Sequence, residues 1–183
     1  MTLSGELLVA TDFSSNADWA CEVAIDWAAQ FGARIHWTHS FEHTYKVTPP
    51  SAAPLMTSYV EKARHTGLER LQTWVDRSRE RGVDSQVRDL ETPIAASIVE
   101  YAREIEADCI VVGAHGHGGL GGVVLGSVAE RVIRNADCDV LVVRGPASPL
   151  SGGPIVLGDE LSIYGGVARK EALTVARALG VDV

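Results

Sequence analysis

Short apolar runs alternate with longer amphipathic segments along most of the chain. Brief apolar and β-branched runs are typical of buried strands, whereas apolar residues spaced by three or four positions are typical of helices. The pattern predicts four intervening helices and five strands, at 7–10, 34–41, 83–90, 109–112 and 140–143. Parallel strands joined by right-handed helical crossovers are the simplest fold for this order. We therefore predict an α/β fold, a doubly wound five-stranded parallel sheet covered on both faces.

Capping residues, glycines and prolines mark the ends of the predicted helices. Residues 14–16 are able to cap the first helix, and Gly32 is expected to end it. Residues 42–56 contain three prolines and are predicted to form a long loop. The amphipathic helix that follows, at 57–81, is expected to be interrupted or bent near Gly67.

The composition changes after Gly145, where glycine, proline and serine become frequent. We therefore predict one domain over residues 1–146 and a linker with a C-terminal extension over residues 147–183. Within the extension, residues 155–157 are predicted to form a short strand and residues 167–179 a helix.

Composition limits the classes of function. With 183 residues, 46% of them hydrophobic, the chain is large enough for one buried core. A formal charge of −8 argues against nucleic-acid or membrane binding through overall charge, although a local site is still able to bind phosphate through backbone donors. Three widely separated cysteines fit neither a disulfide framework nor a zinc site, and no leader or spanning segment is evident. We expect a cytoplasmic protein.

A glycine-rich stretch within 109–144 is the main candidate for chemistry, because seven glycines lie between Gly113 and Gly126. A loop so poor in side chains lets backbone N–H groups converge on an anion. The stretch contains no lysine, which excludes the Walker type of phosphate loop. Residues 116–121 match the spacing of the dinucleotide fingerprint, but they follow the fourth strand instead of the first, so we interpret this match as coincidence.

The remaining spacing, Gly113-x2-Gly116-x9-Gly126-Ser127, closely resembles that of the nucleotide-binding branch of the universal stress protein family. The wording Leu-Gly-Ser-Val-Ala-Glu at 125–130 and Val-Leu-Val-Val-Arg at 140–144 extends the resemblance, as does Leu-Val-Ala-Thr-Asp-Phe-Ser at 8–14. The resemblance covers about residues 5 to 145. It implies an adenine nucleotide alpha hydrolase-like, Rossmann-like sheet in the order 3-2-1-4-5, with ATP between strands one and four and a homodimer through the strand Val140–Arg144.

The resemblance also implies roles for individual residues. Asp12 would bind the ribose hydroxyls, with Ala10 near the base and Thr11 in the same site, and Ser40 would offer backbone groups to adenine. The expected lining of the ribose and phosphates is Val112, Gly113, His115, Gly116, His117, Gly126, Ser127 and Val128. ATP, with Mg²⁺ as a counterion, is the expected ligand.

Four of these positions have a simpler structural explanation. Ser127 and Glu130 have the spacing of a capping box, and Asp12 is placed to cap the first helix. His115 and His117 lack an obvious third partner for a metal site, so they are either solvated or contact phosphate. If they contact phosphate in the protonated, imidazolium form, this binding would weaken as the pH rises through about 6.5 and the charge is lost.

No catalytic triad, nucleophile elbow or carboxylate pair is evident, so slow ATP hydrolysis is the only enzymatic activity that we consider. We expect an ATP-binding stress-response protein in which the nucleotide controls conformation or partner contacts. The alternatives are a dimeric interaction protein that uses no nucleotide and a binder of AMP or a cyclic nucleotide. The unprotected edge of 140–143 favours pairing with a second copy.

Overall fold

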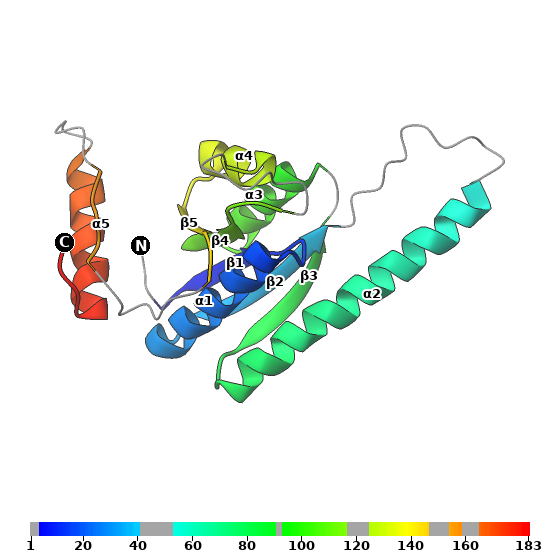
Figure 1. Ribbon diagram of the computed structural model, residues 1–183, viewed down its shortest axis with the longest axis horizontal. Coiled ribbons are helices and arrows are strands. Elements are labelled where there is room, and N and C mark those ends of the chain that lie inside the picture. Colours follow the sequence, from blue (N-terminus) through cyan, green and yellow to red (C-terminus); the bar gives the residue numbers. More distant parts are fainter. Residues whose placement is uncertain (1–3, 41–52, 91–92, 117–124, 147–153, 159–164) are drawn as a thin grey trace.

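The computed structural model describes residues 4–40, 53–90, 93–116, 125–146, 154–158 and 165–183, and it omits the side chains of 53–60 and 165. One parallel sheet forms its centre (Figure 1). Its strands are β1 (Glu6–Ala10), β2 (Arg34–Ser40), β3 (Ser85–Leu90), β4 (Cys109–Gly113) and β5 (Asp139–Val143). Their order is β3-β2-β1-β4-β5, which confirms the predicted fold class and strand order.

Helices cover both faces of this sheet (Figure 1). α1 and α2 pack on one face, and α3 and α4 on the other, while α5 lies apart from the sheet. Their bounds are α1 Ser15–Phe31, α2 Ala53–Glu80, α3 Ile94–Glu104, α4 Ser127–Asn135 and α5 Gly165–Leu179. No helix among these described residues is both long and apolar enough to cross a membrane.

The alternation of side chains along β1 divides the core into two clusters. Leu7 and Val9 pack with α1 and α2, whereas Leu8 packs with α3 and α4. On the first face the buried ring of Trp37 stacks on Trp74 of α2 with 5.8 Å between centroids. Buried aromatic pairs of this kind contribute roughly 0.5–1.5 kcal/mol beyond their area. This contact fixes the C-terminal half of α2 against the sheet.

One predicted boundary in this region is wrong. α2 begins at Ala53, four residues before the expected start, because Pro54 lies in the first turn, where its missing N–H costs no hydrogen bond. The helix also continues through Gly67, which is buried. Its N-terminal half extends beyond the edge of the sheet (Figure 1).

A buried histidine lies on the opposite face, between β1, β2 and α3. His36 is 3% exposed, and both of its ring nitrogens have partners. Nε2 lies 2.6 Å from the Glu6 carboxylate, and Nδ1 lies 2.9 Å from the Tyr101 hydroxyl. A buried polar ring is stable only when such bonds compensate its lost hydration.

The C-terminal extension contains the predicted helix, α5, which begins two residues earlier than expected. Residues 155–157 do not form the predicted strand. Instead, the Ile155 N–H donates to the carbonyl of Asp182 at 2.7 Å, which ties this segment to the residues after α5.

Candidate functional site

A cleft of about 610 Å³ opens at the carboxyl ends of β1, β2 and β4. The strand order reverses between β1 and β4, and this reversal is where ligands bind in open parallel sheets. The volume lies within the range of small-molecule sites. The cleft therefore has both the position and the size expected of the ligand site.

The turn from β1 to α1 forms one wall of the cleft. Asp12 follows the strand, and its Oδ1 accepts a hydrogen bond from the Ser14 N–H at 3.0 Å. Ser14 is the N-cap of α1 and accepts from the Ala17 N–H at 3.3 Å. The hydrogen bonds of this turn therefore restrain the Asp12 carboxylate and the start of α1 together.

At each of Gly113, Gly116 and Gly126 an added Cβ would approach a different neighbour. A Cβ on Gly113 would lie 2.9 Å from the Ala17 nitrogen, because α1 crosses close to β4. A Cβ on Gly116 would lie 2.2 Å from Asp12 Oδ2, and one on Gly126 would lie 3.3 Å from the Ala114 carbonyl. Gly113 is thus required by packing, whereas Gly116 lets the loop backbone approach the carboxylate.

The segment that follows β4 is held against the same turn. The Gly126 N–H donates to the Ala114 carbonyl at 2.8 Å, and the Ser14 hydroxyl donates to the His115 carbonyl at 3.4 Å. His115 Nε2 is buried and has no hydrogen-bond partner within the part of the chain that the structure describes. Buried polar atoms normally have a hydrogen-bond partner. This nitrogen is therefore a candidate to bind a polar group of a ligand.

The N-terminus of α4 forms the opposite wall. Gly126 is the N-cap and Ser127 is the first helical residue, with no side-chain capping bond. The predicted capping box of Ser127 and Glu130 is therefore wrong, since Ser127 lies one residue inside the helix. The first N–H groups of a helix have no intrahelical acceptor, and the positive end of its dipole attracts anions. Ser127 and Val128 line the cleft at this end.

The far end of the cleft lies over β2, β3 and α3 and is mostly apolar. Leu90, Ile94 and Ile98 line it together with Thr38 and His39. His39 Nδ1 lies 2.6 Å from the Thr11 carbonyl and donates a hydrogen bond to it. Burial lowers the pKa of His39 below its ordinary value of 6.5. The ring is therefore neutral at pH 7.

The structure brings most of the sequence-predicted site residues to this one cleft. His117 lies outside the described residues. The predicted residues that line the cleft are Ala10, Thr11, Asp12, Ser40, Val112, Gly113, His115, Gly116, Gly126, Ser127 and Val128. Sequence reasoning did not include His39 among the site residues. It also missed the lining residues Ala17, Thr38, Leu90, Ile94, Ile98, Leu125 and Ala129. Alternation along β2 puts Thr38 and Ser40 on one face and was the available signal for Thr38.

Few titratable side chains line the described part of the cleft. The titratable side chains among its described lining residues are Asp12, His39 and His115. The cleft thus combines one hydrogen-bond-accepting carboxylate and two imidazoles with an apolar slot and a helix N-terminus. A ligand with a flat apolar part, hydroxyl groups and an anionic group would match all of these features.

Comparisons with known proteins identify similar chains. Residues 5–144 match the model of the universal stress protein family. A universal stress protein of Methanocaldococcus jannaschii is 36% identical over 144 residues, which are 77% of this chain and 82% of that protein.

Solved structures are similar as well. Universal stress protein UspA from Lactobacillus plantarum has a TM-score of 0.71 at 21% identity, with 77% of this chain and 98% of that chain covered. The crystal structure of a universal stress protein in complex with cAMP has a TM-score of 0.54 at 26% identity, with 76% of this chain and 96% of that chain covered.

Proposed function

Because the chain belongs to the universal stress protein family, we propose that its cleft binds an adenine nucleotide, ATP in the first instance, and that occupancy of the cleft controls partner contacts during stress. The observation that carries this proposal is the combination, in one cavity of about 610 Å³, of the Asp12 carboxylate with the N-terminus of α4. The carboxylate would bind ribose hydroxyls and the helix N-terminus would bind phosphate.

The phosphate end of the proposed site has backbone donors but little fixed charge. The first N–H groups of α4, at Ser127 and Val128, would donate to phosphate oxygens. His115 Nε2 would donate to another oxygen and thereby gain the partner that it lacks among the described residues. Mg²⁺ would enter with the phosphates, because Asp12 is the single carboxylate among the described lining residues.

The base end of the proposed site would hold adenine in the apolar slot. Ile94, Ile98 and Leu90 would contact the ring, and backbone groups near Ser40 would pair with its polar edge. Burial of a ring between aliphatic side chains contributes roughly 25 cal/mol per Å² of apolar surface removed from water. The slot would therefore supply much of the affinity and the carboxylate much of the selectivity for a ribonucleoside.

A first experiment is mass spectrometry of nucleotide that copurifies with the chain, followed by calorimetric titration of the nucleotide-free protein with ATP. We expect a saturable signal that Asp12→Ala weakens roughly ten- to hundredfold, because a hydrogen bond to a charged group contributes about 1.5–3 kcal/mol. Exposed Asp76 on α2 provides a control, Asp76→Ala, without contact to the cleft. Absence of both copurified nucleotide and titration signal would rule the proposal out.

A second candidate ligand is AMP or cyclic AMP, since a structural neighbour at 26% identity is described in complex with cAMP. Base and ribose contacts do not by themselves require a triphosphate. Titration with ATP, AMP and cAMP in parallel separates the candidates. ATP should bind most tightly if the N-terminus of α4 and His115 act on the terminal phosphates.

We also propose a homodimer through β5, at Val140–Arg144. β5 is an edge strand, and its central residues Val140, Leu141 and Val142 are only partly buried within one chain. Pairing with a second copy would satisfy its free edge. Sedimentation at micromolar concentration should give a dimer, and a monomer there would contradict the interface.

We retain residues 1–146 as the domain and residues 147–183 as an extension, a division supported by the family match, which ends at residue 144. Slow hydrolysis of bound ATP remains compatible with this function, and we assign no catalytic residue to it.

A further inference from the structure

The turn that carries Asp12 is held in a strained form. Phe13 has φ 61°, in the left-handed region that bulky side chains rarely adopt. Its N–H donates to the Thr11 hydroxyl at 2.9 Å, and the next N–H, of Ser14, donates to Asp12. A strained residue of this kind persists only when surrounding contacts over-determine it, and such residues cluster at functional sites.

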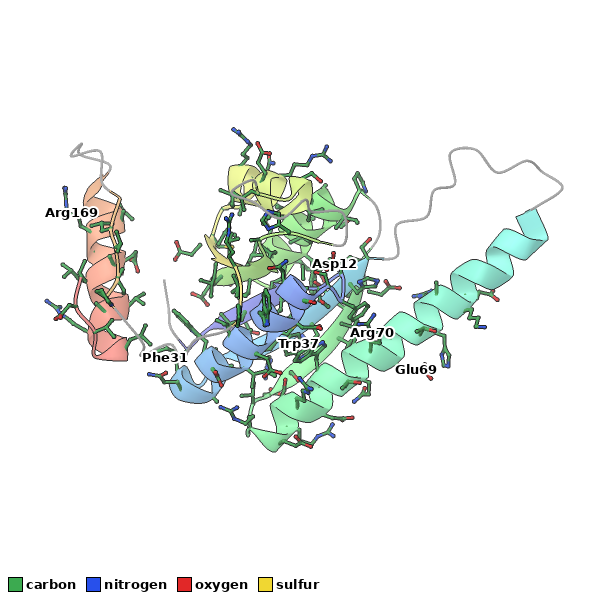
Figure 2. The ribbon with its side chains drawn as sticks, in the orientation of Figure 1. Asp12, Phe31, Trp37, Glu69, Arg70 and Arg169 are labelled. Atoms are coloured by element: carbon green, nitrogen blue, oxygen red, sulfur yellow. The ribbon has the colours of Figure 1, made fainter. Side chains whose placement is uncertain are left out.

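One of those contacts comes from α2, a helix distant in sequence. The Arg70 guanidinium lies 4.2 Å from the centroid of the Phe13 ring and donates from Nη2 to the Phe13 carbonyl at 3.3 Å. It therefore contacts both the side chain and the backbone of the strained residue. Figure 2 shows Arg70 on the part of α2 beside the sheet, below Asp12 in that view.

The other contact comes from β2. The His39 ring lies 4.4 Å from the Phe13 ring, and its Nδ1 donates to the Thr11 carbonyl. Phe13, which is 8% exposed, thus has its ring in contact with both His39 and Arg70. His39 lines the cleft, whereas Arg70 is not among the described residues that line it.

We propose that Arg70 is a positioning residue for the nucleotide site, which holds Phe13 in its left-handed conformation so that Asp12 faces the ligand. This inference rests on the proposed function of the cleft. Without Arg70 the turn would relax toward conformers in which the carboxylate is displaced. Apparent affinity falls in proportion to the fraction of molecules in the competent form.

The positive charge of Arg70 offers a competing explanation for a loss of affinity in Arg70 variants, because this charge would also attract phosphates at a distance. The two explanations differ in their dependence on the ligand. Positioning of Asp12 acts on the ribose, so adenosine and ATP should lose affinity equally. Long-range attraction acts on phosphate, so adenosine would be unaffected and the loss with ATP would shrink at high salt.

The experiment compares Arg70→Met and Arg70→Lys with Arg77→Met in the full chain, titrated with adenosine and with ATP. Arg77 is a matched control, since it lies on the same helix, 4.7 Å over the Trp74 ring, and pairs with Glu22 away from the cleft. We expect both Arg70 variants to weaken binding of both ligands roughly five- to tenfold, and Arg77→Met to leave binding unchanged. Lysine should fail because it lacks the planar fork that spans ring and carbonyl.

A second variant tests the mechanism through Phe13 itself. Glycine adopts positive φ without steric cost, so Phe13→Gly removes the need for the restraint. In that background Arg70→Met should weaken adenosine binding by less than about twofold, a non-additivity that marks direct coupling. Equal losses in both backgrounds would overturn the role of Phe13, and titrations well below the Tm of each variant exclude unfolding as the cause.

Amide hydrogen exchange of the ligand-free chain supplies a readout that needs no nucleotide. The Phe13 and Ser14 amides should exchange faster in Arg70→Met than in wild type, whereas Arg77→Met should leave them unchanged. If wild type binds and Arg70→Met shows unchanged amide exchange or unchanged affinity, the positioning role alone would be overturned. Failure of wild type to bind adenosine or ATP would instead overturn the proposed function, and the role of Arg70 with it.

Discussion

Replacement of Gly116 by alanine should damage ligand binding while it leaves the fold intact. The new Cβ would lie 2.2 Å from Asp12 Oδ2 and 3.3 Å from its Cγ, where ordinary contact begins at 3.4 Å. The carboxylate must therefore retreat by about 1 Å or turn away. Gly116 is exposed and does not belong to the glycines with positive φ, so alanine fits its backbone.

The magnitude follows from what Asp12 loses. If its carboxylate binds the ribose, displacement removes hydrogen bonds to a charged group, which contribute about 1.5–3 kcal/mol, or roughly ten- to hundredfold in Kd. Folding stability changes little, because loss of the Asp12 bond to the Ser14 N–H costs about 1 kcal/mol and the alanine recovers about 0.4–1 kcal/mol from reduced freedom of the unfolded chain.

Gly113→Ala provides the matched control with the opposite outcome. Its Cβ would lie 2.9 Å from backbone atoms of Asn16 and Ala17 at the start of α1, which are less able to move than a side chain. Overpacking of this kind costs about 1–3 kcal/mol. At this chain length a loss of about 2 kcal/mol lowers the Tm by roughly 4–8 °C.

Calorimetric titration with ATP and thermal unfolding followed by circular dichroism measure the two effects separately. We expect Gly116→Ala to lose affinity at nearly wild-type Tm and Gly113→Ala to lose Tm. Wild-type affinity in Gly116→Ala, at any Tm, would refute the assignment of Asp12 as a ligand contact. A wild-type Tm in Gly113→Ala would refute the packing explanation for that glycine.

Three further predictions concern stability. Because the pKa of His39 is lowered in the folded chain, the unfolded chain takes up the proton first as the pH falls. The free energy of unfolding should therefore fall as the pH drops below about 6.5. His39→Gln should flatten this slope in urea titrations at pH 7.5 and 5.5. Ser14→Ala removes the N-cap of α1 and should cost about 1 kcal/mol in urea unfolding, with Ser15→Ala as the neighbouring control that should cost less. Glu6→Ala removes the partner of buried His36 and should cost about 1–3 kcal/mol, and no loss would mean that water replaces the carboxylate.

The family spacing located the candidate site from sequence, yet it did not reveal why the glycines are needed. Gly113, Gly116 and Gly126 read alike in the sequence as parts of a phosphate loop. In the structure they meet α1, Asp12 and the Ala114 carbonyl, respectively. Only the path of the neighbouring backbone distinguishes packing from access, and that path is a property of the assembled sheet.

Periodicity by itself predicted the five strands and their alternation with helices. These features follow from local hydrophobic patterns and from the handedness of parallel crossovers, which are properties of short segments. That β1 and β4 are neighbours followed instead from the resemblance to the universal stress protein family.

Tertiary structure decided which distant side chains join these strands. Arg70 lies in the predicted helix and His39 in the predicted second strand, and neither was a predicted site residue, but α2 and β2 bring both into contact with Phe13. Leu90 and Ile98 reach the cleft only because β3 packs beside β2 and α3 packs against β3. Such contacts depend on register and helix placement across the whole sheet, which local sequence patterns do not encode.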